Sequence, residues 1–190
     1  MNKTIWVILA IVTVLAIGSV FSYNSLVTMN ENVNGKWSQV ENQLQRRADL
    51  IPNLVNTVNG YAAHEQQTIQ AVADARTKLA GAQGPAAKAG ANGELNSALS
   101  RLLVVVENYP NLKADQNFRA LMDELSGSEN RLAVARKDYN ESVQSYNTAI
   151  RSLPASVLAG LFGFGSKEYF KADDGAKQVP QVKFDPVRSK

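Results

Sequence analysis

Apolar residues recur at intervals of three and four from residue 23 to residue 79. Steps of seven from Tyr23 fall mostly on apolar or aromatic positions, namely Trp37, Leu44, Ile51, Val58, Val72 and Leu79. An alternation of this length is typical of a helix that buries one continuous face against other helices. The pattern therefore predicts one long helix over residues 24–81.

Pro52 lies inside this predicted helix. Proline lacks a backbone N–H and its ring crowds the preceding turn, so it usually kinks or ends a helix. The seven-residue pattern nevertheless continues unchanged on both sides of Pro52. We therefore predict a continuous helix with a kink of roughly 20–30° near residues 49–52. A full reversal of the chain at Pro52 is the alternative.

Three further segments follow this helix. The glycines and alanines of residues 82–93 predict a loop, and residues 94–108 form a second apolar helical pattern. Pro110 predicts a break over residues 109–114. A third helix is expected to begin at Asp115 as its N-cap and to end at Pro154. Its buried face shares the seven-residue spacing, through Phe118, Leu125, Leu132, Tyr139, Tyr146 and Leu153.

These segments predict an all-α fold, in which the N-terminal transmembrane helix continues into an antiparallel long-helix hairpin. An up-and-down four-helix bundle is the form expected if Pro52 reverses the chain. In an antiparallel pairing the facing residues match in character. We expect Arg47 opposite Glu129, Glu41 opposite Arg136, Leu44 opposite Leu132, and Trp37 near Tyr139.

Residues 1–23 form a membrane anchor in this interpretation. The run from Ile5 to Phe21 contains nothing more polar than Thr13 and Ser19, and as a helix it is about 26 Å long. A cleaved secretory signal ending near Ser22 is the competing interpretation. Lys3 favours a cytoplasmic N-terminus, which would place the helical domain outside the cytoplasm.

A second apolar stretch follows the helical domain, which we delimit as residues 24–154. Residues 155–164 carry no charge and precede Lys167 and Lys171. They are too few to cross a bilayer but suit a segment that lies at its surface. Two antiparallel arms or four alternating helices would both return the chain to the level of Tyr23. We therefore expect Leu158, Leu161, Phe162 and Phe164 beside Tyr23–Val27, either in the interface or packed on the juxtamembrane turn, and the alternative is that they cap the bundle core away from lipid. The remainder of residues 155–190 is predicted to be a flexible tail.

Charge and composition exclude several function classes. Residues 24–154 contain 13 Lys and Arg against 13 Asp and Glu, which argues against nucleic-acid binding. The chain has no cysteine, so disulfides and thiolate chemistry are excluded. The Gly81–Gly93 segment lacks the Gly-Lys-Ser/Thr ending of a phosphate-binding loop.

The single histidine does not form a metal motif. His64 precedes Glu65, but position 68 is threonine where a zinc-protease helix would place a second histidine. We instead expect Glu65 to lie opposite residues 109–113 and to accept hydrogen bonds there. The paired Arg46 and Arg47 are interpreted as salt-bridge partners rather than as a phosphate or acidic-lipid site. We predict no catalytic, cofactor-binding or metal-binding residues, no cofactor, and no enzymatic activity.

Short motifs spread over the chain resemble the LemA family. They are Asn42–Val55 (NQLQRRADLIPNLV), Gly60-Tyr61, His64-Glu65, Asn117-Phe118, Glu124-Leu125, Glu129–Arg131, Arg136–Asn140, Tyr146-Asn147, Gly163-Phe164 and Tyr169-Phe170. The resemblance implies a protein of the bacterial inner membrane with one N-terminal span and a helical-bundle domain. The family is commonly drawn with a cytoplasmic domain, contrary to the charge of Lys3, so both orientations stay open.

The predicted function is that of a single-pass membrane-anchored helical scaffold that mediates protein or membrane association. The expected partners are membrane lipid, a membrane protein of unassigned identity and further copies of the chain, without nucleic acid. Uncharged amides on the first helix favour homo-oligomers because they repel copies of themselves less than charged side chains do; they are Gln39, Asn42, Gln43, Asn53, Asn56, Gln66, Gln67 and Gln70. An accessory subunit of a membrane enzyme, such as a quality-control protease, is the alternative.

Overall fold

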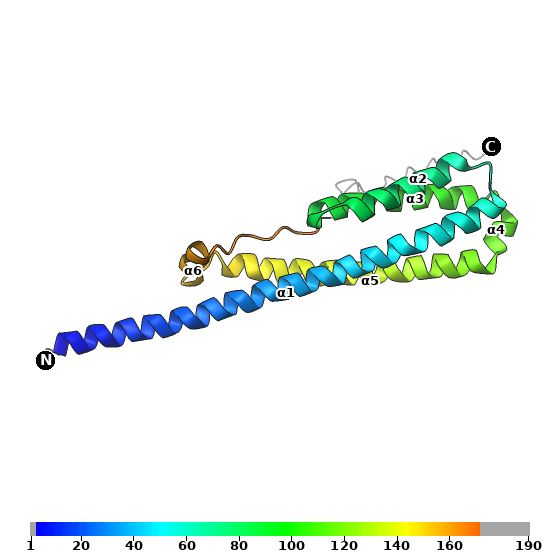
Figure 1. Cartoon of the computed structure of the whole chain (residues 1–190). Helices are drawn as coiled ribbons and strands as arrows, with labels where there is room; N and C mark the ends of the chain where they lie inside the picture. Colours follow the sequence, from blue (N-terminus) through cyan, green and yellow to red (C-terminus); the bar gives the residue numbers. More distant parts are fainter. Residues whose placement is uncertain (1–2, 172–190) are drawn as a thin grey trace, which may run out of the picture.

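The computed structural model describes residues 3–171, which are helical apart from short connections and a C-terminal extended segment (Figure 1). The helices are α1 (Lys3–Tyr61), α2 (Gln66–Gly81), α3 (Gly84–Val106), α4 (Pro110–Ala114), α5 (Gln116–Ala149) and α6 (Ala155–Phe162). The predicted all-α fold is confirmed. The tail expected to be flexible lies, beyond residue 171, outside the described residues.

The first helix is continuous through Pro52, as predicted, but it ends at Tyr61 instead of Gly81. The chain reverses over residues 62–65, where Ala62 and Glu65 are tied by short-range backbone hydrogen bonds. The long-helix prediction was wrong because Val58 and Val72, on opposite sides of the reversal, both point into the same core. The spacing of apolar residues reports which face is buried and does not reveal a tight turn that keeps the spacing intact.

The reversal produces an up-and-down four-helix bundle (Figure 1). The distal part of α1 runs outward, α2 returns, α3 runs outward again, and α5 returns past α1. The four-helix alternative is therefore correct, although the chain reverses at residues 62–65 and not at Pro52. The proposed division at residue 23 stays a prediction, since α1 crosses it without a break.

The predicted loop over residues 82–93 is wrong, because α3 begins at Gly84 and only Ala82 and Gln83 join the hairpin. Gly84 has a φ of 76°, a left-handed conformation that glycine adopts without strain, and Pro85 stands in the first turn of α3. The small side chains that suggested flexibility are packed instead, with Ala89 and Ala91 buried. The break over residues 109–114 contains a short helix, α4, whose Leu112 is buried.

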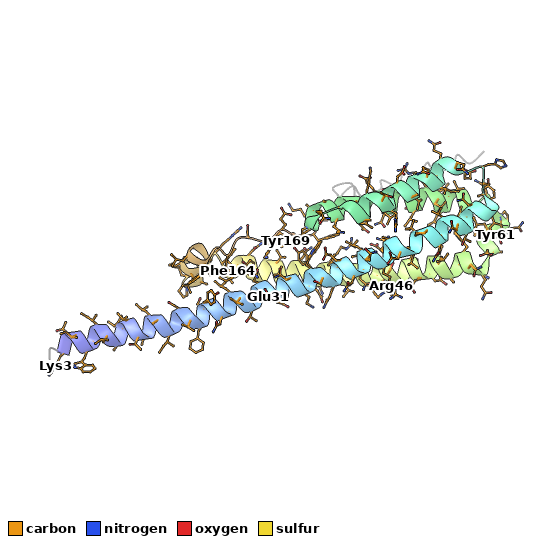
Figure 2. All side chains as sticks on the ribbon, in the orientation of Figure 1. Lys3, Glu31, Arg46, Tyr61, Phe164 and Tyr169 are labelled. Carbon is orange, nitrogen blue, oxygen red and sulfur yellow. The ribbon has the colours of Figure 1, made fainter. Side chains whose placement is uncertain are left out.

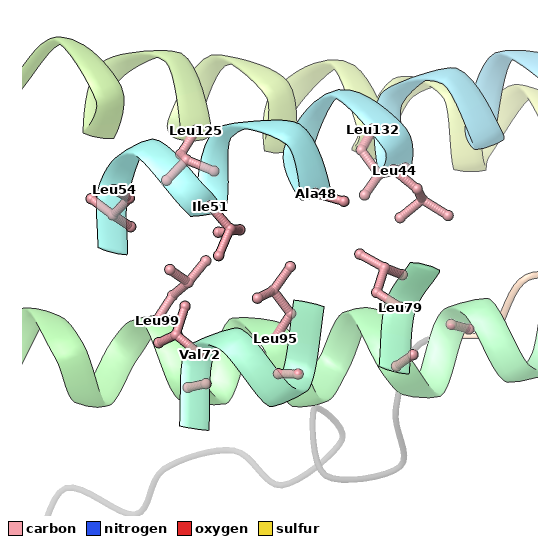
Figure 3. Close-up of a cluster of buried hydrophobic side chains, with 14 of the residues drawn as sticks. Leu44, Ala48, Ile51, Leu54, Val72, Leu79, Leu95, Leu99, Leu125 and Leu132 are labelled. Carbon is pink, nitrogen blue, oxygen red and sulfur yellow. The ribbon is translucent and has the colours of Figure 1, made fainter. Parts of the chain in front are cut away.

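Leucine, isoleucine and valine from α1, α2, α3 and α5 form one core (Figure 3). Its labelled members include Leu44, Ile51, Leu54, Val72, Leu79, Leu95, Leu99, Leu125 and Leu132. Leu79, near the end of α2, lies across from Leu44 of α1. The α2–α3 hairpin therefore covers the distal part of α1 and α5, and it stops before the part that approaches the apolar end of α1.

The predicted pairing of α1 with α5 is confirmed at three of four positions. Arg47 Nη1 lies 2.5 Å from Glu129 Oε2, and the rings of Trp37 and Tyr139 have centroids 5.2 Å apart. Leu44 and Leu132 are both buried in the shared core. The pairing of Glu41 with Arg136 is wrong: Glu41 is exposed, and Arg136 Nη2 lies 3.3 Å from Glu129 Oε1 instead.

Candidate functional surface at the apolar end of the first helix

The first turns of α1 carry a band of exposed apolar side chains. Every residue from Ile5 to Phe21 is exposed, and the helix projects beyond the bundle, with only α6 lying beside the last residues of this stretch (Figure 2). Within residues 3–171, α1 is the one helix long and apolar enough to cross a membrane. Ser19 and Thr13 satisfy their hydroxyls on carbonyls one turn back, so they add little polarity to the band.

The short helix α6 packs against the end of this band. The ring centroid of Tyr23 lies 4.9 Å from that of Phe162 and 5.8 Å from that of Phe164, both in edge-on arrangements. Gly163 ends α6 with a φ of 74°, and the amide of Phe164 then donates to the carbonyl of Ala159. The predicted position of residues 155–164 beside Tyr23 is confirmed.

Most of α6 faces outward. The side chains of Leu161 and Phe162 are 75% and 60% exposed, and Ala159 is the residue of this helix that is buried. The helix and α1 enclose an apolar groove of about 400 Å³, lined by Ser19, Val20, Tyr23, Leu158, Leu161 and Phe162. The alternative that this segment caps the bundle core is wrong for Leu161 and Phe162, because a capping side chain would be covered by the core.

An extended segment after α6, residues 164–171, returns along α5 and is called the strap below (Figure 1). Asn147 donates from Nδ2 to the carbonyl of Lys167 at 2.9 Å and accepts from its amide at 2.8 Å. Asn140 makes the same pair of bonds with Phe170, at 3.0 and 2.9 Å. Two side chains on α5 thus hold the backbone of the strap.

The strap ends in an aromatic pocket between α1 and α5. Phe170 is 3% exposed, and its ring centroid lies 6.4 Å from that of Trp37. The guanidinium carbon of Arg136 stands 5.6 Å from the Phe170 ring centre, within range of a cation–π contact. The hydroxyl of Tyr139 donates to the Glu168 carbonyl at 2.7 Å, and burial, followed by the nearby Glu168 carboxylate, raises the pKa of Tyr139 to about 12.

A buried polar cluster lies deeper in the bundle. Arg47 is 3% exposed, pairs with Glu129, and donates to the side-chain oxygens of Asn92 and, at 2.6 Å, Asn96. Burial lowers the pKa of Arg47, the charge of Glu129 opposes this shift, and the nearby Arg136 adds to it. Arg46 pairs with Glu124 at 2.9 Å. Both arginines therefore join α1 to its neighbours, as the sequence interpretation expected.

The residue next to the single histidine makes a contact that joins two parts of the bundle. Glu65 accepts a hydrogen bond from the Tyr109 hydroxyl at 3.2 Å, so its predicted position opposite residues 109–113 is confirmed. The donor is a side chain rather than the expected backbone amides. His64 lies in the exposed turn between α1 and α2. Among residues 3–171 no three His, Asp or Glu side chains gather as metal ligands would.

Sequence reasoning missed the strap. Asn140, Asn147 and Phe170 had been noted only as motif residues, without a role. Two signals were available: asparagines seven residues apart on one helix, and aromatic residues in a tail otherwise rich in charge. Neither signal indicates that the asparagines contact the tail, because a hydrogen bond between a side chain and a distant backbone produces no periodic pattern in the sequence.

Comparison with known proteins gives a consistent set of similarities. A model of the LemA family matches residues 36–184. Magnetosome protein MamQ 2 of Paramagnetospirillum magneticum is 33% identical, over 84% of this chain and 70% of its own length. Magnetosome protein MamQ of Magnetospirillum gryphiswaldense is 32% identical over the same shares. Protein LemA of Metamycoplasma hominis is 20% identical, over 80% of this chain and 69% of its own.

Proposed function

This chain belongs to the LemA family and is a membrane-associated helical protein, and from that premise we propose that it is a single-pass scaffold of the bacterial inner membrane. In this proposal α1 crosses the bilayer once and carries the bundle on a continuous helix. The bundle then mediates protein or membrane association without chemistry of its own. The observation that carries the proposal is the exposed apolar helix α6 beside the end of the apolar band.

The continuity of α1 supports a rigid projection of the bundle. From Tyr23 to Tyr61 the helix extends about 57 Å at 1.5 Å per residue, and it pairs with α5 over much of that length. A helix packed along one side resists bending more than a linker would. The anchor and the bundle therefore move as one body, and surfaces of the bundle are presented at a defined height above the membrane.

The position of α6 supports a second contact with the bilayer. Tyr23 follows the apolar band and contacts Phe162, so Leu161 and Phe162 are held at the level where the band ends. Exposed aromatic and aliphatic side chains at that level partition favourably into the membrane interface. Lys167 and Lys171, which the sequence had suggested as headgroup contacts, lie on the strap and are carried along α5 away from the end of the band, with Lys167 beside Asn34, so the proposed contact rests on the apolar side chains of α6 alone.

A lipid-depth experiment tests this proposal. Because the chain lacks cysteine, a single fluorescent thiol label can be placed at Leu161→Cys in the full chain reconstituted into liposomes. We expect quenching by spin-labelled lipids. Val104→Cys on α3, where valine is 71% exposed, is the matched control and should not be quenched. Equal behaviour of the two labels would show that α6 does not touch lipid.

Association between copies is the other part of the proposal. Two hollows on the α1–α5 face are lined by amide side chains beside a few charged ones: one includes Gln39, Gln43 and Asn130 with Arg131 and Asp138, and the other includes Asn53, Asn56 and Asn117 with Glu124. The amides repel copies of themselves less than charged side chains do, and the two charges in the first hollow are of opposite sign. Purification in mild detergent should yield defined homo-oligomers. A monomer that co-purifies stoichiometrically with another membrane protein would point to an accessory-subunit role instead.

A further inference from the structure

Near the apolar end of α1, the strap covers a part of the bundle that the α2–α3 hairpin does not reach. The α2–α3 hairpin covers the distal part of the groove between α1 and α5, and the strap covers the groove nearer the membrane (Figure 1). Beneath the strap lie large residues that would otherwise meet water, including Trp37 and Tyr139. The proximal groove is thus a surface that needs an extended peptide to complete it.

The two asparagines match the repeat of an extended peptide. Asn140 and Asn147 are seven residues apart, which places them about 10.5 Å apart along a helix. Lys167 and Phe170 are three residues apart, which is about 10 Å in an extended chain. Each asparagine bonds both the N–H and the C=O of its partner residue. Recognition of this kind selects an extended backbone and leaves most side chains of the peptide free.

Phe170 is the residue by which the groove would distinguish one extended peptide from another. Its ring fills the pocket beside Trp37 and under Arg136, and it is the one strap residue that is fully buried. Lys167 adds a bond from its ammonium to Asn34 on α1, at 3.4 Å. The groove therefore recognises an extended segment with a phenylalanine three residues after a lysine.

We propose that this groove is a peptide-binding site and that it accepts residues 164–171 of a second copy in place of its own strap. The second copy carries the same backbone spacing and the same phenylalanine, so every contact is reproduced in trans. Gly163 and Gly165 flank the start of the strap with open space around them, and they provide the hinge for release. Copies anchored by α1 hold their straps at the same height, where exchange requires only lateral approach.

A labelled peptide with the sequence of residues 163–171 tests the groove. The wild-type full chain should bind it weakly, because the attached strap competes at a high effective concentration. In Phe170→Ala the attached strap loses its anchor, and we expect binding at least tenfold tighter than to wild type. Adding Asn140→Ala to the Phe170→Ala variant should weaken peptide binding by about tenfold. A peptide with alanine at the position of Phe170 is the matched control and should not bind.

The peptide result is interpreted only where circular dichroism shows unchanged helix content, and Phe170→Leu provides a milder second variant. Failure of both variants to bind the peptide, or equal binding of the two peptides, would overturn the proposed site.

Thiol cross-linking tests exchange between copies. Two differently tagged full chains, one with Asn34→Cys and one with Lys167→Cys, are co-expressed and treated with a short bismaleimide. We expect a cross-linked pair of the two chains. Phe170→Ala on the Asn34→Cys chain should increase its yield by emptying that groove, and the same change on the Lys167→Cys chain should decrease it. Asn32→Cys, at a similar height on the opposite side of α1, is the control.

The strap exchange rests on the proposed function only because the membrane anchor would bring two copies together. The experiments distinguish failure of the exchange from failure of the proposed membrane contact. If the double variant Asn34→Cys/Lys167→Cys links within one chain and no link forms between chains, the strap acts only on its own chain and the exchange is wrong. If peptide binding and exchange are seen but the Leu161 label is not quenched by lipid, this inference stands and the second membrane contact of α6 fails.

Discussion

Arg76 of α2 donates from Nε to the backbone carbonyl of Ala48 in α1, at 3.3 Å. In a regular helix that carbonyl would accept from the residue four places on, which is Pro52, and proline has no N–H to give. Ala48 is buried, so water does not readily replace the missing donor. The arginine of the neighbouring helix therefore completes the hydrogen bonding that Pro52 interrupts, and this contact helps α1 to continue through the proline.

Replacing Arg76 by Met should expose this dependence. The change keeps an apolar stem but leaves a buried carbonyl without a donor, so we expect a loss of about 1–2 kcal/mol of unfolding free energy. In a Pro52→Ala background the helix supplies its own donor, and the same change should cost clearly less. Denaturant unfolding of the four chains in mild detergent measures the coupling. Equal costs in both backgrounds would contradict the proposed link between the two residues.

The ion pair of Arg47 with Glu129 should respond unequally to loss of either partner. Glu129→Gln leaves the buried guanidinium without its counter-charge, and we expect a loss on the order of 3 kcal/mol. Arg47→Met fills similar space with apolar atoms and removes the buried cation, but Glu129 Oε2 and the buried Asn92 side-chain oxygen lose their contact with Arg47, while Glu129 Oε1 keeps Arg136. That change should cost less than Glu129→Gln, about 1–2 kcal/mol. Equal losses of unfolding free energy in the two variants would show that leaving Arg47 without its counter-charge is no more costly than removing Arg47.

Alkaline pH should loosen the strap. The pKa of Tyr139 is raised from 10.0 to about 12, so the folded state holds its proton more tightly than the unfolded state. The resulting stability is fully present below pH 10.0 and is lost as the pH rises toward about 12. The fluorescence of Trp37, next to Tyr139, should change in that window. Burial also raises the pKa of Tyr146, so Tyr139→Phe should remove only part of the pH dependence.

Acid should weaken the start of α5. Asp115 accepts from the amide of Phe118 at 2.8 Å and from the hydroxyl of Tyr61 at 2.9 Å, and these bonds, in that order, hold its pKa below 3.8. Their contribution is present above pH 3.8 and is lost as the pH falls through the lower folded value. Asp115→Asn keeps an acceptor without titrating. The melting temperatures of the two chains should therefore converge as the pH is lowered, and parallel curves would contradict this role.

Much of the fold follows from local patterns in the sequence. The seven-residue spacing through Trp37 and Leu44 identified the buried face of α1, and the matching spacing through Leu132 and Tyr139 identified that of α5. Complementary residues on the two faces then predicted the antiparallel pairing, including Arg47 with Glu129. The cap at Asp115 was likewise recognised from its position before an apolar run.

The placement of α6 also followed from the sequence, by a different route. An even number of alternating arms, whether two or four, returns the chain to the level of Tyr23, where α1 leaves the apolar band. That argument placed residues 155–164 beside Tyr23 although the assumed reversal was wrong, and the contacts of Tyr23 with Phe162 and Phe164 confirm it.

Two features were decided by the tertiary structure alone. The spacing of apolar residues determined which side of each helix is buried, but it is the same whether residues 58–72 form one helix or two helices that share a core. The turn after Tyr61 is therefore selected by the packing of α2 and α3 against α1 and α5, which buries Val58 and Val72 together. The strap depends on Asn140 and Asn147 bonding a backbone some 20–30 residues further along the chain. Contacts of that kind produce no periodic pattern in the sequence and do not follow from the secondary-structure propensity of any residue. Only the folded arrangement of α1 and α5 reveals them.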